Sequence, residues 1–165
     1  MVPAGRIATI GVYGFSAEAF LEALRSAGVG RLIDVRQRRG VRGSEYAWAN
    51  ARRLQGALAE AGIEYRHHRD LAPTTELRQL QYREDARLGV GKRSRAELAP
   101  EYRDRYVKEI LNRADLALVV DHLGPSDVFA LLCVEHDPEA CHRSLVADRL
   151  AADHGVTVKH LRPPR

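Results

Sequence analysis

The chain has 165 residues, the length of one ordinary domain, and its 45% hydrophobic and 29% charged residues exclude a disordered or fibrous protein. It contains no apolar run near the ~20 residues of a membrane span and no signal-peptide apolar region after the first charges. We therefore expect a cytoplasmic protein with no membrane partner. Two cysteines, Cys133 and Cys141, are too few for a disulfide framework and should remain thiols in that compartment.

The net charge of +4 is distributed unevenly along the chain. Of the 26 basic residues 23 are arginine, a bias that codon usage in a GC-rich genome explains. The segment from Arg31 to Arg53 nevertheless holds seven arginines against Asp34 and Glu45, a local charge of +5, so the rest of the chain sums to −1. Arginine offers a planar fork that suits phosphates and carboxylates. The segment therefore predicts an anionic partner.

Strands and helices alternate in the first part of the chain. The elements expected there are a strand at 7–10, a helix at 16–27, a strand at 32–35, a helix at 50–61 and a strand at 63–67. Ser16 and Asn50 are the expected helix caps. This β-α-β-α-β order predicts a parallel sheet with right-handed crossovers.

The second part of the chain is more helical. We expect helices at 75–88, 100–111 and 137–153 and strands at 128–134 and 156–161, and we interpret 114–123 as a helix although its apolar run also fits a strand. The sequence thus predicts a single three-layer α/β domain over residues 1–165, with a mainly parallel central sheet of about 4–5 strands and flanking helices.

A buried strand runs into a polar loop that opens a helix at Leu131–Leu145. Ligands of open α/β sheets bind outside the carboxyl ends of strands, and helix N-termini attract anions. We expect His142, Arg143 and Ser144, in the first turns of that helix, to contact a phosphate or carboxylate. The alternative is a structural ion pair between Asp34, at the end of the second strand, and Arg143.

The two cysteines suggest a comparison with rhodaneses and tyrosine phosphatases, which carry their nucleophile in a strand-loop-helix segment. Those enzymes place an arginine five or six positions after the nucleophilic thiol. Here Glu139 and Ala147 stand six positions after Cys133 and Cys141, so we disfavour a thiol nucleophile and interpret both cysteines as buried packing residues.

The same loop offers ligands that zinc could use. They are Cys133, Glu135, His136, Asp137, Cys141 and His142. Their spacing matches neither a Cys-x-x-Cys knuckle nor a His-Glu-x-x-His helix, so the sequence predicts no metal site. No motif indicates a cofactor either.

The loop after the second strand combines charge, glycine and aromatic residues. We expect Arg36, Arg38, Arg39 and Arg42 to bind phosphate, with Gly40 and Gly43 allowing close approach of the backbone. Aromatic surfaces beside arginines suit a nucleotide or single-stranded nucleic acid. We also expect Tyr13, which follows the first strand, to be a ligand-binding residue. A solvated basic loop, with Trp48 as a core anchor, is the alternative.

Possible catalytic residues follow from the same edge of the sheet. If the protein is an enzyme, His142 or His67 is the expected acid or base, with Glu135 as its partner. A thiol-dependent enzyme of rhodanese or reductase type, using Cys141 before Cys133, is one alternative. A non-catalytic adaptor for an acidic protein partner is another.

Four segments together resemble the domain-of-unknown-function 488 family over nearly the whole chain. They are Thr9–Gly11, Leu32–Arg36, Gly62–His67 and Leu131–Ser144. The most specific element is Leu-Leu-Cys followed by Cys-His-Arg. The resemblance implies a compact α/β domain and no established reaction.

The resemblance also places six residues on the motif positions of that family: Arg36, Cys133, Glu135, Cys141, His142 and Arg143. The sequence departs from the usual pattern at Val12–Ser16, where His-Ser is common, and at Leu71–Pro73, where Leu-Gly-Gly is common. The departures suggest a divergent subgroup in which the arginine-rich loop substitutes as the binding feature.

Overall fold

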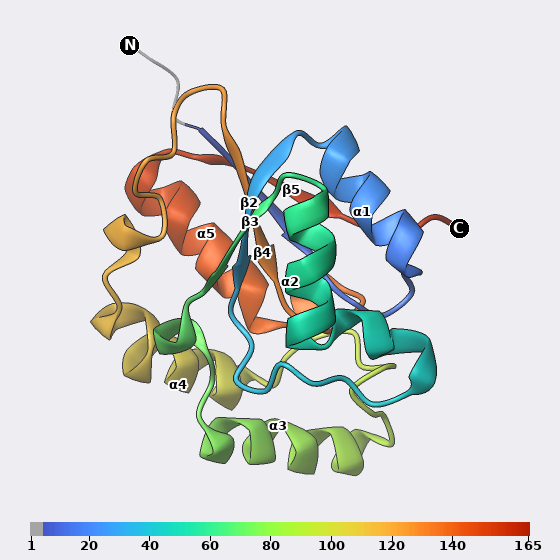
Figure 1. Cartoon of the computed structure of the whole chain (residues 1–165). Coiled ribbons are helices and arrows are strands. Elements are labelled where there is room, and N and C mark those ends of the chain that lie inside the picture. The colour runs from blue at the N-terminus through green and yellow to red at the C-terminus, as the bar shows by residue number, and fades with distance from the viewer. Residues whose placement is uncertain (1–4) are drawn as a thin grey trace.

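A five-stranded parallel sheet forms the centre of the protein in the computed structural model, which describes residues 5–165 (Figure 1). The strands are β1 (Arg6–Ile10), β2 (Val29–Asp34), β3 (Glu64–His67), β4 (Val128–Leu132) and β5 (Thr157–Leu161), in the order β3-β2-β4-β1-β5. All four pairings are parallel. β4 is buried along its whole length, as its uninterrupted apolar sequence predicts.

The described part of the chain forms five α-helices: α1 (Ala17–Ser26), α2 (Ala51–Glu60), α3 (Thr75–Leu88), α4 (Pro100–Glu109) and α5 (His142–His154). α1 begins at Ser16, whose hydroxyl accepts a hydrogen bond from the Ala19 N–H at 3.1 Å. Gly155, in the left-handed conformation at φ 67°, ends α5. These caps are the signals by which the sequence predicts the helices.

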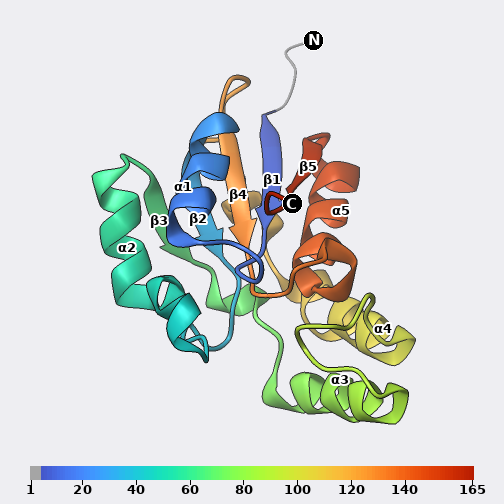
Figure 2. The same cartoon turned by 90° about the vertical axis from the view of Figure 1, so that its right-hand side faces the viewer.

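The helices and the sheet form three layers. α1 and α2 cover one face, α5 covers the other face, and α4 packs against α5 (Figures 1 and 2). α3 lies apart from both layers, below the carboxyl ends of the strands. The predicted α/β class, parallel sheet and flanking helices are confirmed. Within the described residues, no helix has the length and apolar character needed to cross a bilayer.

The strand order creates a crevice between β2 and β4. From β1 and β2 the chain moves toward the β3 edge, whereas from β4 it moves toward the β5 edge. Crossovers of one hand then place α1 and α2 on one face and α5 on the other. Neighbouring parallel strands whose connections leave in opposite directions open a ligand crevice at their carboxyl ends.

Three local predictions are wrong. Asn50 does not cap α2, because its side chain accepts from the Val41 N–H instead. Residues 114–123 form only a short 3-10 turn, Leu116–Leu118, because the Asp115 side chain accepts from the Ala117 N–H at 3.2 Å and Leu118 is 59% exposed. α5 begins at His142 and not at Asp137, because Pro138–Ala140 forms a separate turn and Cys141 is extended.

Candidate functional site

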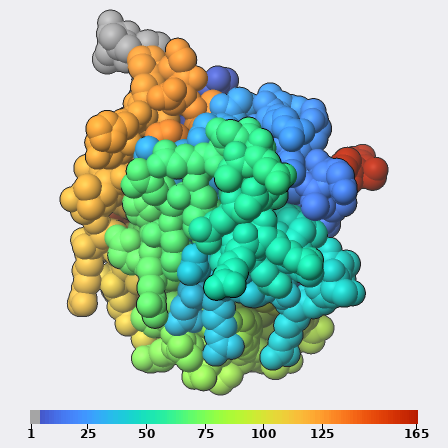
Figure 3. Space-filling model, viewed as in Figure 1, coloured from blue at the N-terminus to red at the C-terminus, as the bar shows by residue number. Residues whose placement is uncertain are grey.

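A cavity of about 700 Å³ lies at the predicted crevice. Its walls are the loop after β2, the loop after β4, α3 and the segment 91–95 that follows α3. The loop after β2 reaches the surface above α3, where Arg38, Gly40 and Arg42 are exposed (Figure 3). Asn50 holds this loop, since its side-chain Oδ1 accepts from the Val41 N–H at 2.7 Å and does not cap α2.

The lining of the cavity is strongly cationic. Its positively charged side chains are Arg36, Arg38, Arg42, Arg78, Lys92, Arg93 and Arg95, and its one carboxylate is that of Glu135. Among the described residues, Arg38, Arg42, Arg78 and Lys92 form no ion pair. Four positive charges therefore face the cavity without a carboxylate in ion-pair contact.

Arg36 lines the cavity and forms a buried ion pair with Asp34. Its guanidinium donates to the Asp34 carboxylate at 2.8 and 2.9 Å and to the Ala49 carbonyl at 2.9 Å. Asp34, which is fully buried, also accepts from the Tyr65 hydroxyl at 2.6 Å. Burial alone lowers the pKa of Arg36, but the bonds and charge of Asp34 raise it. Arg36 is thus a permanent cation with most of its donors occupied.

A second set of buried ion pairs at the cavity is centred on Arg95. Arg95 donates to Asp85 and to Glu135 Oε1, each at 2.7 Å. The other Glu135 oxygen, Oε2, is buried and has no hydrogen-bond partner among the described residues. Burial, followed by the negative charge of Cys141, raises the pKa of Glu135. Lys92 also lines the cavity. Burial acts to lower the pKa of its ammonium, but the charges of Glu135 and of further acidic groups together raise it above its usual value, so the ammonium persists.

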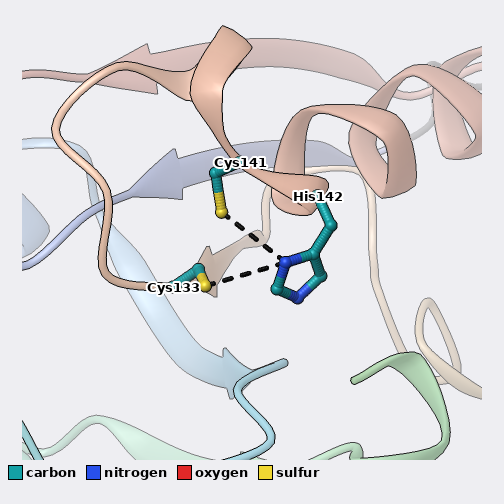
Figure 4. Close-up of side chains that lie close together, drawn as sticks. All are labelled: Cys133, Cys141 and His142. Carbon is teal, nitrogen blue, oxygen red and sulfur yellow. Dashed lines mark hydrogen bonds between the residues drawn. The ribbon is translucent and has the colours of Figure 1, made fainter. Parts of the chain in front are cut away.

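Two thiols and an imidazole meet at the floor of the cavity (Figure 4). Cys133 directly follows β4, Cys141 is the residue before α5, and His142 is the first residue of α5. His142 Nδ1 lies 3.8 Å from Cys133 Sγ and 3.7 Å from Cys141 Sγ. Its Nε2 lies 2.8 Å from the Val35 carbonyl oxygen, which can only accept, so Nε2 carries a hydrogen. In the neutral ring the bare Nδ1 therefore faces both sulfurs.

The environments of the two thiols differ. Burial raises the pKa of Cys133, which lines the cavity. Burial also acts to raise the pKa of Cys141, but a hydrogen bond from Cys133 and the charges of His142 and Arg143 lower it below its usual range. The Arg143 backbone N–H also points at Cys141 Sγ, at 3.5 Å. Negative charge in this cluster is therefore held by Cys141.

Six of the predicted site residues line the cavity: Tyr13, Arg36, Arg38, Arg42, Glu135 and His142. The loop and the start of α5 thus converge on one cavity, as the carboxyl-edge rule predicts. Trp48 packs against the core, with its ring 4.8 Å from that of Phe20.

Five predicted site residues do not line the cavity: Cys141, Arg143, Ser144, Arg39 and His67. Cys141 lies one layer deeper and is 1% exposed. Arg39 donates to the Tyr65 hydroxyl at 3.3 Å, and His67 bonds the Arg36 carbonyl at 2.9 Å. The two bonds stabilise the loop after β2, and neither side chain lines the cavity.

Arg143 and Ser144 bond within the loop that joins β4 to α5. The Ser144 hydroxyl donates to the Cys141 carbonyl at 2.9 Å. Arg143, fully buried, donates to the Glu135 carbonyl at 2.8 Å and to the His136 carbonyl at 3.4 Å. The alternative ion pair between Asp34 and Arg143 is wrong, because Asp34 pairs with Arg36.

The sequence reasoning missed the contribution of α3 and of the segment after it. Arg78, Gln81 and Tyr82 lie three and four residues apart on one face of α3, and all line the cavity. Lys92, Arg93, Ser94 and Arg95 follow Gly91 and close the cavity. The run Gly-Lys-Arg-Ser-Arg, with three cations in four residues, was the signal that could have identified this wall.

The chain is an open, doubly wound α/β domain with a cationic crevice at the point where the strand order reverses. In proteins of this class, ligands generally bind at that crevice. The chain belongs to the family described as domain of unknown function DUF488, which matches residues 16–150. The resemblance drawn from the motifs is thereby confirmed. No curated protein and no solved structure matches the chain.

Proposed function

We propose that the protein binds a phosphate-bearing ligand of nucleotide size in the cavity at the carboxyl ends of β2 and β4. The observation that carries this proposal is the excess of unpaired cations: Arg38, Arg42, Arg78 and Lys92 face a volume of about 700 Å³. Cavities of roughly 300–1,000 Å³ hold small molecules. This size favours a nucleotide, or one nucleotide of a single strand, over a long nucleic-acid segment.

The cavity offers both a positive charge for the phosphates and aromatic rings for the base. The guanidinium of Arg78 is positioned by Gln37 Oε1 at 2.7 Å and by the Tyr82 hydroxyl at 3.0 Å. Neither partner carries a negative charge, so a phosphate would be its first counter-ion. Tyr82, which is 38% exposed, and Tyr13 both line the cavity, and each has an aromatic ring on which a base can stack.

A thiol-dependent enzyme is less well supported. The thiol that faces the cavity, Cys133, is the one whose pKa burial raises, whereas Cys141, with the lowered pKa, does not line the cavity. A nucleophile must be both ionised and accessible. An adaptor for an acidic protein is also less well supported, because the four unpaired cations line the same concave cavity as Glu135 and His142.

Calorimetric titration with AMP, ADP and ATP tests the proposal, with adenosine as the uncharged probe. We expect affinity to rise with the number of phosphates, adenosine to bind far more weakly, and the affinity of all three nucleotides to fall at high salt. Equal affinity for adenosine and ATP, or no binding of any nucleotide, would overturn the proposal.

The triple variant Arg38→Gln, Arg42→Gln, Lys92→Gln identifies the surface that binds. Hydrogen bonds to charged groups each contribute about 1.5–3 kcal/mol, so we expect the affinity for ATP to fall roughly 100-fold or more. None of the three side chains forms an ion pair with the described residues, so the fold should persist.

A matched control removes the same charge elsewhere. Arg52, Arg53 and Lys108 are exposed, lie on α2 and α4, and do not line the cavity. The variant Arg52→Gln, Arg53→Gln, Lys108→Gln should bind ATP as the wild type does. Equal losses in the two triple variants would show that net charge, and not this cavity, attracts the nucleotide.

A further inference from the structure

We propose that Cys133, Cys141 and His142 form a metal-binding site with zinc as the ion that its donors fit, and with the fourth coordination position open to the cavity. The proposal concerns the floor of the cavity and holds whether or not the cationic walls bind phosphate. It contradicts the expectation from sequence spacing that the chain has no metal site.

The distances between the donor atoms fit tetrahedral zinc. Zn–S and Zn–N bonds of about 2.3 and 2.0–2.1 Å place a sulfur and a nitrogen donor about 3.6 Å apart, and two sulfurs about 3.8 Å apart, at tetrahedral angles. His142 Nδ1 lies 3.8 Å from Cys133 Sγ and 3.7 Å from Cys141 Sγ. All three donor atoms lie within 4.8 Å of one another. The two sulfur–nitrogen distances lie about 0.1–0.2 Å from the tetrahedral value, and the two sulfurs need to approach each other by about 1 Å at most.

The imidazole already presents the correct nitrogen. A histidine ligand donates its second N–H to a backbone carbonyl or a carboxylate, which fixes the ring and leaves the other nitrogen bare for the metal. His142 Nε2 bonds the Val35 carbonyl at 2.8 Å, and the ring of Tyr106 packs beside it with centroids 5.4 Å apart. Nδ1 is thereby directed at the two sulfurs, as Figure 4 shows.

The surroundings also suit metal-bound thiolates. Cys141 Sγ receives the Arg143 N–H at 3.5 Å, at the N-terminus of α5, where the helix dipole favours negative charge. Two thiolates and a neutral imidazole neutralise one divalent ion, so the buried centre carries no net charge. Binding would release to solvent the protons that the three donor groups still carry. The soft sulfur donors favour zinc over magnesium or calcium.

The cavity beside the three donors also contains a carboxylate oxygen that has no partner among the described residues. Cys133 and His142 both line the cavity, and so does Glu135. Arg95 holds Glu135 Oε1, while Oε2 is buried, with no partner among the described residues and 5% of the residue exposed. A water molecule on the metal can donate to that oxygen. Three protein ligands, one exchangeable position and a neighbouring carboxylate are the arrangement of zinc sites that bind water or a ligand anion.

Local sequence spacing does not predict this metal site, because its ligands come from the ends of two different elements, β4 and α5. Cys133 directly follows β4, and after the turn Pro138–Ala140 the chain places Cys141 close to it. The eight-residue separation belongs to no common zinc motif. The fold brings the third donor, His142 Nδ1, close to the two sulfurs.

Titration of the reduced, chelator-treated full chain with Co²⁺, followed by absorption, tests the proposal. We expect one equivalent to give the near-ultraviolet band of cobalt-thiolate charge transfer and the intense visible bands of tetrahedral cobalt. Zn²⁺ should abolish both. Weak octahedral bands, no thiolate band, or a stoichiometry other than one would overturn the proposal. The wild-type titration is decisive by itself, so a variant that fails to fold does not weaken the test.

Variants then assign the ligands. Cys133→Ser and Cys141→Ser should each lose part of the thiolate band, and His142→Gln should lose the tetrahedral visible bands. The control is His136→Asn, which changes an exposed histidine of the same loop that does not line the cavity. Its spectrum should match the wild type. An unchanged spectrum in either cysteine variant would place the metal elsewhere.

Discussion

The ion pair between Asp34 and Arg36 lies beneath the cavity, and the variant Asp34→Asn removes its negative charge with little change in shape. Arg36 is 2% exposed and would keep its positive charge. The amide would meet guanidinium N–H groups where the carboxylate accepted them at 2.8 and 2.9 Å. Removing one partner of a buried ion pair costs about 3–5 kcal/mol, because the other charge remains uncompensated.

Urea unfolding, followed by circular dichroism, measures this effect. With a dependence on urea of about 2 kcal/mol per M, we expect the midpoint to fall by roughly 2 M. Asp104→Asn, at an exposed position on α4, is the control and should stay within about 0.5 kcal/mol of the wild type. The double variant Asp34→Asn, Arg36→Met should recover part of the loss, because it leaves no unpaired charge. A midpoint for Asp34→Asn equal to that of the control would refute the reasoning.

Three further replacements test the packing around the cavity, each by thermal or urea unfolding. Gly11→Ala would make the new Cβ clash with the Glu135 carbonyl oxygen; we therefore expect a lowered melting temperature and weaker ATP binding, and a wild-type melting temperature would contradict this contact. Gly56→Ala, inside α2 with nothing within 4 Å of the new Cβ, should stabilise the protein by about 0.5–1 kcal/mol; destabilisation would show a hidden contact. Tyr106→Phe removes the hydrogen bond to the buried Leu71 carbonyl and should cost about 1–3 kcal/mol, whereas no loss of stability would mean that this bond contributes nothing.

Local signals in the sequence predict the scaffold well. Apolar runs, helix caps and glycines at helix ends predict a segment for each of the five strands and five helices, although Asn50 does not cap α2, α5 begins later than predicted, and the helix expected at 114–123 is absent. The regular alternation of the first part implies a parallel sheet. Because parallel strands end at one edge, the loops after β2 and β4 could be expected to converge, and they do.

The remaining parts of the site depend on packing that local periodicity does not encode. α3 is amphipathic only weakly, so its sequence does not show that Arg78 and Tyr82 face a cavity shared with β4. Arg143 has the sequence position of an anion ligand. It nevertheless points inward, because α5 begins only at His142 and directs that side chain at the Glu135 carbonyl.

A crystal structure of the protein with bound ADP tests the central proposal most directly. We expect the phosphates within hydrogen-bond distance of at least two of Arg38, Arg42 and Lys92, and the base beside Tyr82 or Tyr13. Phosphates bound instead at another basic surface, such as Arg52 and Arg53 on α2, with the cavity filled only by water, would contradict the proposed function.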